Sequence, residues 1–265
     1  PALVNGIYIV QAGTGTDQIG RFDIMVDTDL NAIDTFTWQL IPINNETCQK
    51  DEEMEQFINH YRKETDKKYD RIVTRFTNCL THPVRNQETA LGNLMADILC
   101  DSLGIDLMLM GSGAIRSYEL GPVVHYQDLV ECLPYDEAVY MLQVNGTQLE
   151  RMLRRILREE AFEGEHTEFY QFSHGMQIIW SRGQQEFETL TLNGKALDQQ
   201  KLYTIALSKF HYMNIQNFLN ISLEEIKINA PPRVLATSYR DIVEEYMMMN
   251  PHLSSEVEGR LIVKT

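Results

Sequence analysis

The sequence has few cysteines, no long hydrophobic run and a shortage of positive charge. Its four cysteines, Cys48, Cys79, Cys100 and Cys132, never form a CxxC pair, so their spacing indicates neither a zinc site nor a redox motif. No apolar stretch approaches the roughly 18 residues that a membrane-spanning helix needs. The 23 lysines and arginines against 38 acidic residues give a net charge of -15, which argues against binding a nucleic-acid backbone or an anionic membrane. A small anionic ligand, which needs only local positive charge, stays open.

Motifs for catalysis are also missing. The sequence contains no HExxH, no Gly-x-Ser-x-Gly elbow and no Walker loop. None of its seven histidines falls in a metal-like pair, so each is interpreted as a surface or structural residue: His60, His82, His125, His166, His174, His211 and His252. We therefore do not expect this chain, considered alone, to perform a reaction.

The length and the apolar content allow a substantial core. With 265 residues, of which 43% are hydrophobic, the chain can form one large domain or two unequal ones. The first forty or so residues read as strands, and residues 51–66 read as a charged helix with acids first and bases last, which suits the helix dipole. This helix is typical of a connector. The predicted division is a β-rich segment 1–47, a connector helix 48–69 and a main domain 70–265.

The most informative stretch runs from Arg85 to Arg116. Apolar residues at helical spacing predict a buried helix over 91–99, and the apolar run 105–110 predicts a strand buried on both faces. The turn 111–116 follows the strand and contains two glycines. Two guanidiniums beside free backbone N–H groups would form an anion site. A tight bend with two surface arginines is the alternative interpretation of the same residues.

The remainder of the chain alternates strand and helix signals. Tyr135 follows Pro134 and is expected on a loop. Thr147 with Glu150 is interpreted as a capping box after an Asn145-Gly146 turn, and Ser238 with Asp241 as a second helix start. Asn193-Gly194 predicts a hairpin. These patterns favour an α+β fold with mixed sheets and helices packed outside them, with further strands at 138–144, 176–180, 188–192, 203–207 and 260–263.

Five short motifs in sequence order carry a family resemblance. They are Arg85-Asn-Gln-Glu-Thr-Ala-Leu-Gly-Asn93, Gly111-Ser-Gly-Ala-Ile-Arg116, Leu133-Pro-Tyr135, Leu192-Asn-Gly-Lys-Ala-Leu-Asp198 and Val257-Glu-Gly-Arg260. Together they resemble the C-terminal domain of the 5'-nucleotidase and UDP-sugar hydrolase family, from about Thr74 onward. Residues 5–23 resemble the last strands of that family's metallophosphatase domain. The first residues, from Pro1 onward, are neither a start methionine nor a signal peptide. We therefore expect the chain to be part of a longer protein.

The resemblance implies a division of labour between two domains. In this family an N-terminal domain carries two divalent metal ions that activate water, and the C-terminal domain holds the nucleotide and rotates it to the metals. The resemblance therefore implies that the chain is the substrate-binding part of a bacterial phosphoric ester hydrolase acting on nucleotides. It is expected to be inactive by itself, without a catalytic residue, a metal site or a cofactor of its own. Its expected partners are a nucleotide or nucleoside and its own N-terminal domain. The scattered cysteines favour a cytoplasmic location, with a secreted or cell-surface one as the alternative.

The site residues follow from the same resemblance. Arg85 and Arg116 match substrate-binding arginines, and Gly113 belongs to the glycine turn. Tyr135 and Phe210 match two aromatic residues that clamp the base. Stacking would grip any flat heterocycle and contributes about 1–3 kcal/mol per base. Without the resemblance, an aromatic residue after a strand would be interpreted as core packing.

Two departures weaken the resemblance. The family's Gly-Gly-Asp-Gly is replaced by residues 214–217, where Gln216 takes the place of an aspartate that binds ribose and is a weaker acceptor. Gly111 replaces an asparagine or serine. An interaction or dimerisation module that has lost nucleotide recognition is therefore the alternative function. A third hypothesis is a self-sufficient enzyme that uses Asp136, Glu137 or His211.

Overall fold

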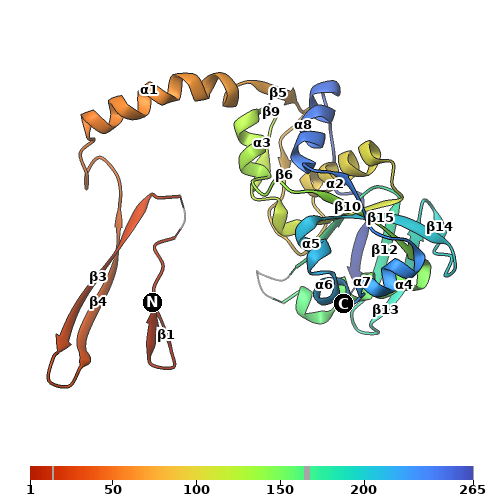
Figure 1. Ribbon diagram of the computed structural model, residues 1–265, viewed down its shortest axis with the longest axis horizontal. Helices are drawn as coiled ribbons and strands as arrows, with labels where there is room; N and C mark the ends of the chain where they lie inside the picture. The colour runs from red at the N-terminus through yellow and green to blue at the C-terminus, as the bar shows by residue number, and fades with distance from the viewer. Residues whose placement is uncertain (14, 164–167, 265) are drawn as a thin grey trace. The chain divides into compact units, whose positions relative to one another are not determined.

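The computed structural model describes residues 1–13, 15–163 and 168–264, so His166 lies outside the described residues (Figure 1). The chain divides into two compact units, Pro1–Thr65 and Asp66–Thr265. The division falls within helix α1 (Glu52–Tyr69). The domain limits drawn from the sequence stay a prediction.

The first unit contains two β-hairpins and the larger part of helix α1, without a core. Strands β1 (Ala2–Val4) and β2 (Ile7–Ile9) pair through a turn in which Asn5 and Gly6 have φ values of 50° and 78°. The longer strands β3 (Gln18–Asp27) and β4 (Ala32–Pro42) form a second hairpin. No described residue of this unit is buried, so its strands build no core of their own.

The second unit is organised on a five-stranded mixed sheet. Its order is β11-β7-β15-β10-β16, in which β7 and β15 are parallel and the other neighbours antiparallel. This arrangement confirms the predicted α+β class with mixed sheets. The strands are β7 (Leu107–Gly111), β10 (Val139–Asn145), β11 (Tyr170–Phe172), β15 (Leu202–Ser208) and β16 (Arg233–Ala236).

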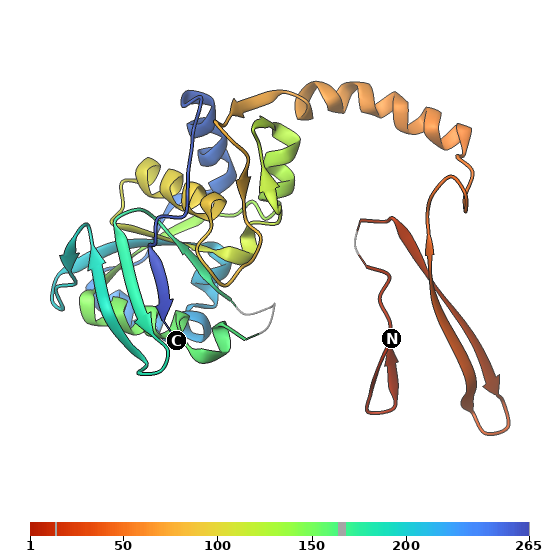
Figure 2. The same cartoon turned by 180° about the vertical axis from the view of Figure 1, so that it is seen from behind.

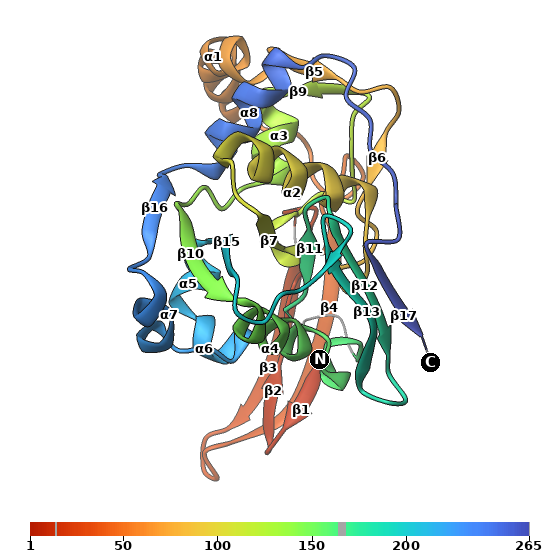
Figure 3. The ribbon, with the colours of Figure 1, turned by 90° about the vertical axis from the view of Figure 1, so that its right-hand side faces the viewer.

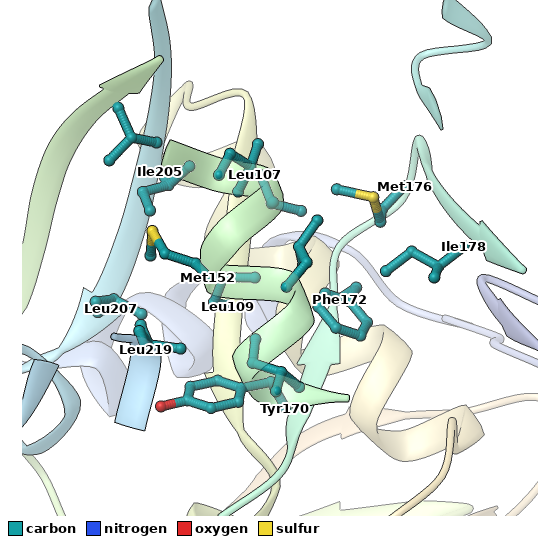
Figure 4. Packing of buried hydrophobic residues seen from close by; sticks show 14 of the residues in the cluster. Leu107, Leu109, Met152, Tyr170, Phe172, Met176, Ile178, Ile205, Leu207 and Leu219 are labelled. Carbon is teal, nitrogen blue, oxygen red and sulfur yellow. The ribbon is translucent and has the colours of Figure 1, made fainter. Parts of the chain in front are cut away.

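Strand β7 is buried on both faces, as its apolar sequence predicts. Successive side chains of a strand point to opposite faces. Leu107 and Leu109 therefore enter one hydrophobic cluster, and Met108 and Met110 enter the other. Figure 4 shows the first of these clusters, in which Leu107 and Leu109 lie near Met152. The strand's carboxyl end is thus held rigidly between two cores.

Helices cover both faces of this sheet (Figure 3). Helices α2 (Ala90–Leu103), α3 (Tyr126–Cys132) and α8 (Tyr239–Met249) supply buried residues to the cluster that contains Met108. Helices α4 (Gly146–Ile156), α6 (Ile215–Leu219) and α7 (Leu223–Asn229) supply the opposite cluster. Helix α5 (Lys209–Met213) follows β15 directly.

A second sheet, in teal with dark-blue β17 in Figure 2, adds to the first cluster. Its order is β14-β13-β12-β17. Asn193 and Gly194 have φ values of 53° and 72° at the turn between β13 and β14, which confirms the predicted hairpin. The strands are β12 (Met176–Ser181), β13 (Glu186–Leu192), β14 (Lys195–Ala196) and β17 (Leu261–Lys264). Two small pairs, β5 (Ile72–Arg75) with β9 (Val123–His125) and β6 (Leu80–Thr81) with β8 (Glu119–Leu120), complete the unit.

The start of α4 corrects one sequence prediction. Asn145 ends β10 and is itself the N-cap of α4, and it forms a reciprocal capping box with Gln148. Thr147 instead donates its hydroxyl to the Gln199 side chain at 2.8 Å. The predicted Thr147–Glu150 box is wrong because strand and helix join without an intervening turn. Ser238, by contrast, caps α8 by accepting the Asp241 N–H at 2.9 Å, as expected.

The cysteines are all free thiols. Cys100 and Cys132 are buried, and burial raises the pKa of Cys132 to about 12. Across the described ranges, no helix combines the length and apolarity required to cross a membrane.

Candidate functional site

One cavity of about 570 Å³ gathers most of the predicted site residues. Arg85, Gly113, Arg116, Tyr135 and Phe210 all line it, although they come from segments far apart in the sequence. The other lining residues are Ala114, Asp136, Glu137, Glu168 and His211.

Arg85 stands on the segment between β6 and α2. Thr89 ends this segment as the N-cap of α2, and its hydroxyl accepts the Gly92 N–H at 3.1 Å. The Arg85 guanidinium passes closely over the glycine turn, because a Cβ built on Gly113 would lie 3.5 Å from Arg85 Nη1. The helix cap thus fixes where the arginine segment ends, and the guanidinium lies close to the glycine turn.

Arg116 stands just after the 3-10 turn η1 (Ser112–Ala114), which follows β7. Its Nη1 donates to the Gly113 carbonyl at 3.5 Å, and its guanidinium carbon lies 5.8 Å from the centre of the Tyr135 ring, within cation–π range. Among the described residues, no carboxylate forms an ion pair with Arg85 or Arg116. Their positive charge is therefore available to an anion in the cavity.

The two aromatic rings are only partly covered. Tyr135 is 55% exposed and Phe210 is 48% exposed, so neither serves as ordinary core packing. Phe210 is held edge-on against His211 at 5.2 Å and lies 5.6 Å from Phe218. Its backbone N–H donates to Glu137 Oε2 at 2.9 Å. The ring is supported from behind and presents free surface to the cavity.

The acidic groups and the histidine of the cavity already have partners. Asp136 pairs with Arg240 at 3.3 Å, and Glu137 accepts the N–H of the aromatic segment. His211 is 3% exposed; its Nδ1 contacts Ser208 Oγ at 3.0 Å and its Nε2 contacts Glu168 Oε2 at 3.2 Å. These contacts favour structural roles for the three residues of the self-sufficient enzyme hypothesis.

Gly111 and Gln216 do not line this cavity. Gly111 ends β7, and a Cβ there would lie 2.0 Å from His211 Cε1, so glycine is required to admit the imidazole ring. Gln216 is exposed on α6. A ribose contact by Gln216 stays a prediction without support from the cavity lining.

The predicted nest of free amides is smaller than the sequence suggested. Within the turn, the Ser112 N–H donates to the Phe169 carbonyl at 2.8 Å and the Arg116 N–H to the Cys132 carbonyl at 2.8 Å. The Ile115 N–H closes the turn on the Ser112 carbonyl. Any anion recognition here must therefore rest chiefly on the guanidiniums.

Two buried polar residues, His82 and Gln171, contact the segments that carry the arginines, and the sequence analysis did not single them out. His82 Nδ1 contacts Thr89 Oγ1 at 2.8 Å, and its Nε2 contacts the Ser112 carbonyl at 3.1 Å. Burial lowers the pKa of His82 to about 4, with a smaller contribution from the nearby charge of Arg85. Gln171 is 1% exposed within the otherwise apolar β11. For Gln171, the available sequence signal was a lone polar residue between two large aromatic residues, Tyr170 and Phe172.

Known proteins resemble both the sequence and the fold. A family model described as "5'-nucleotidase, C-terminal domain" matches residues 70–221. A 5'-nucleotidase of Vibrio cholerae is 22% identical over 231 residues, which cover 80% of this chain and 40% of the relative. A 5'-nucleotidase precursor from Thermus thermophilus superposes with a TM-score of 0.72 at 16% identity over 96% of this chain and 51% of that one. The NAD nucleotidase of Haemophilus influenzae has a TM-score of 0.64 at 12% identity, covering 91% and 48%.

The fold and the cavity define an α+β domain built around one arginine-lined and aromatic-lined cleft. The match over more than half of the chain identifies it further: the chain belongs to the 5'-nucleotidase C-terminal domain family. It spans about half the length, or less, of the relatives it resembles.

Proposed function

We propose that this chain is the substrate-binding part of a nucleotidase-type phosphoric ester hydrolase and that its ligands are nucleotides. The observation that carries the proposal is the cavity in which Arg85 and Arg116 meet the half-exposed rings of Tyr135 and Phe210. The names of the relatives, 5'-nucleotidases and an NAD nucleotidase, supply the ligand class.

The phosphate and the base of a nucleotide each have a chemically suited neighbour in this cavity. A phosphate is a multivalent acceptor that guanidiniums bind through charge-assisted hydrogen bonds. Neither arginine has an ion-pair partner in the described part of the chain, so binding a phosphate would not require breaking one. The flat base would stack on the rings, which tolerate any heterocycle. Together they would hold and orient the substrate.

Hydrolysis requires further groups. Within the described ranges, no cluster of three or more His, Cys, Asp or Glu side chains could hold a metal ion. We propose that the two divalent ions expected for this family are bound by an N-terminal domain, and that this chain alone does not release phosphate.

Calorimetric titration with AMP, UMP and adenosine tests the proposal. We expect saturable binding of the nucleotides, with weaker binding of adenosine because it lacks the phosphate. Folded protein that binds none of the three at millimolar concentration would contradict it. Phosphate release from AMP by the purified chain in buffer with added Mn²⁺ or Zn²⁺ would contradict the predicted inactivity.

An interaction or dimerisation module is the second candidate function. It is favoured by the unit Pro1–Thr65, in which no described residue is buried and apolar side chains such as Ile7, Ile19 and Phe57 are exposed. Light scattering distinguishes the two functions: a monomer that binds nucleotides excludes the interaction module, and a dimer without nucleotide binding supports it.

The cytoplasmic location also stays a prediction, motivated by the free cysteines.

A further inference from the structure

A single buried carboxamide joins the two segments that carry the cavity's arginines. Gln171 Oε1 accepts the Thr89 N–H at 3.1 Å and lies 3.3 Å from the Thr89 hydroxyl oxygen. Its Nε2 donates to the Gln87 carbonyl and to Ser112 Oγ, both at 2.9 Å. Gln87 and Thr89 belong to the Arg85 segment, and Ser112 opens the turn that leads to Arg116.

The local backbone is shaped to accept this side chain. Tyr170 and Phe172 enter one hydrophobic cluster, so the strand's alternation directs Gln171 to the opposite face, toward α2. A Cβ on Gly92 of α2 would lie 2.3 Å from Gln171 Oε1, so only glycine there allows the amide its position. The side chain is therefore fixed by the fold before any ligand binds.

His82 bridges the same two segments from a second position. Its Nδ1 contacts Thr89 Oγ1 and its Nε2 contacts the Ser112 carbonyl, and the residue is 6% exposed. Buried polar networks rigidify a structure when their members are satisfied. The histidine can replace part, but not all, of the connection because Gln87 is bonded by Gln171 alone among these contacts.

We propose that Gln171 is a positioning residue that sets the spacing between Arg85 and Arg116, and so determines how tightly the cavity holds a phosphate. This inference rests on the proposed nucleotide-binding function. An amide suits the role because it donates and accepts from one planar group, whereas a carboxylate only accepts and a thioether does neither well. Tyr135 and Phe210 lie on other segments and form no described hydrogen bond with Gln171.

The consequence is selective for the phosphate half of the ligand. Without Gln171, the two guanidiniums would sample a wider range of separations, and a phosphate that binds both would lose part of its charge-assisted hydrogen bonding. Affinity for a nucleotide should fall about tenfold or more, from the strength of hydrogen bonds to charged groups. Affinity for the matching nucleoside, held through its base, should change less than about twofold.

The test compares Gln171→Met with Ser173→Ala in the 265-residue chain. Ser173 is the matched control because it is fully buried two residues along and accepts the Met108 N–H at 3.0 Å, but bonds neither arginine segment. AMP and adenosine affinities are measured by calorimetry, and hydrogen exchange is followed over residues 85–89 and 112–116. In Gln171→Met we expect the AMP-selective loss and exchange at least about fivefold faster in both segments, the rate equivalent of one lost hydrogen bond. Ser173→Ala should show neither effect.

Several outcomes would overturn the inference. Equal losses for AMP and adenosine, no loss for either, or unchanged exchange in both segments would each do so. If Gln171→Met fails to fold, Gln171→Glu keeps the size and the acceptor oxygen, and it should still show the AMP-selective loss because both donated bonds are gone. If the unaltered chain binds neither ligand, the proposed function fails, and the exchange measurement still decides whether Gln171 orders the two segments.

Discussion

Replacing Phe210 by alanine should weaken nucleotide binding through the base alone. The ring is 48% exposed, so its removal costs the fold little compared with a core residue. A base stacked on an aromatic side chain contributes about 1–3 kcal/mol, which corresponds to about a 5- to 150-fold rise in the dissociation constant. The backbone N–H that Glu137 accepts is retained in alanine, so the segment's main anchor survives.

The assay is calorimetry with two ligands that differ by one part. AMP carries a base and a phosphate, whereas ribose 5-phosphate carries only the sugar and the phosphate. We expect Phe210→Ala to weaken AMP binding by the factor above and to change ribose 5-phosphate binding by less than about twofold. Tyr118→Ala is the control, because Tyr118 is 64% exposed and does not line the cavity.

Three results would refute the reasoning. If AMP and ribose 5-phosphate lose the same affinity, Phe210 supports the arginine side or the general fold and does not stack on the base. If AMP binding is unchanged while Tyr135→Ala abolishes it, the base lies on one ring only. A loss in Tyr118→Ala equal to that in Phe210→Ala would show an effect unrelated to the cavity.

Three further predictions concern charge, pH and helix capping. Arg85→Ala and Arg116→Ala should each weaken AMP binding about tenfold while sparing adenosine, and added salt should reduce the difference; equal losses for both ligands would contradict this. His82 has a pKa of about 4 in the folded chain, below its unfolded value of about 6.5. Between these pH values the unfolded chain binds one more proton than the folded chain, so the stability of the fold falls as the pH drops through this window. Urea denaturation at pH 7.5 and 4.5 measures how much unfolding free energy is lost between the two pH values. This loss should be smaller in His82→Gln than in the unaltered chain, by up to about 3 kcal/mol, and identical losses would refute the assignment. Asn145→Ala should cost about 1 kcal/mol of unfolding free energy and Thr147→Ala less than about 0.5 kcal/mol; the reverse order in thermal denaturation would restore the sequence-based cap.

Sequence patterns located the scaffold of the site because they depend on local geometry. The apolar stripe of α2 and the run in β7 follow from helical and strand periodicity, and both are buried as expected. The hairpin at Asn193-Gly194 follows from the backbone freedom of those two residues. Local patterns failed at the start of α4, because both Asn145 with Gln148 and Thr147 with Glu150 match a capping box. Only the path of β10 decides that Asn145 caps the helix.

The sequence by itself determined the family, the α+β class and the main candidates Arg85, Arg116, Tyr135 and Phe210, because short motifs in order and local periodicity survive without coordinates. Only the tertiary structure decided that these four side chains share one cavity and that the two arginines have no carboxylate partner in the described residues. It also brought Gln171 between the two arginine segments. Hydrogen-bond partners and charge neutralisation depend on which distant segments the sheet order places together, and no local pattern encodes that order.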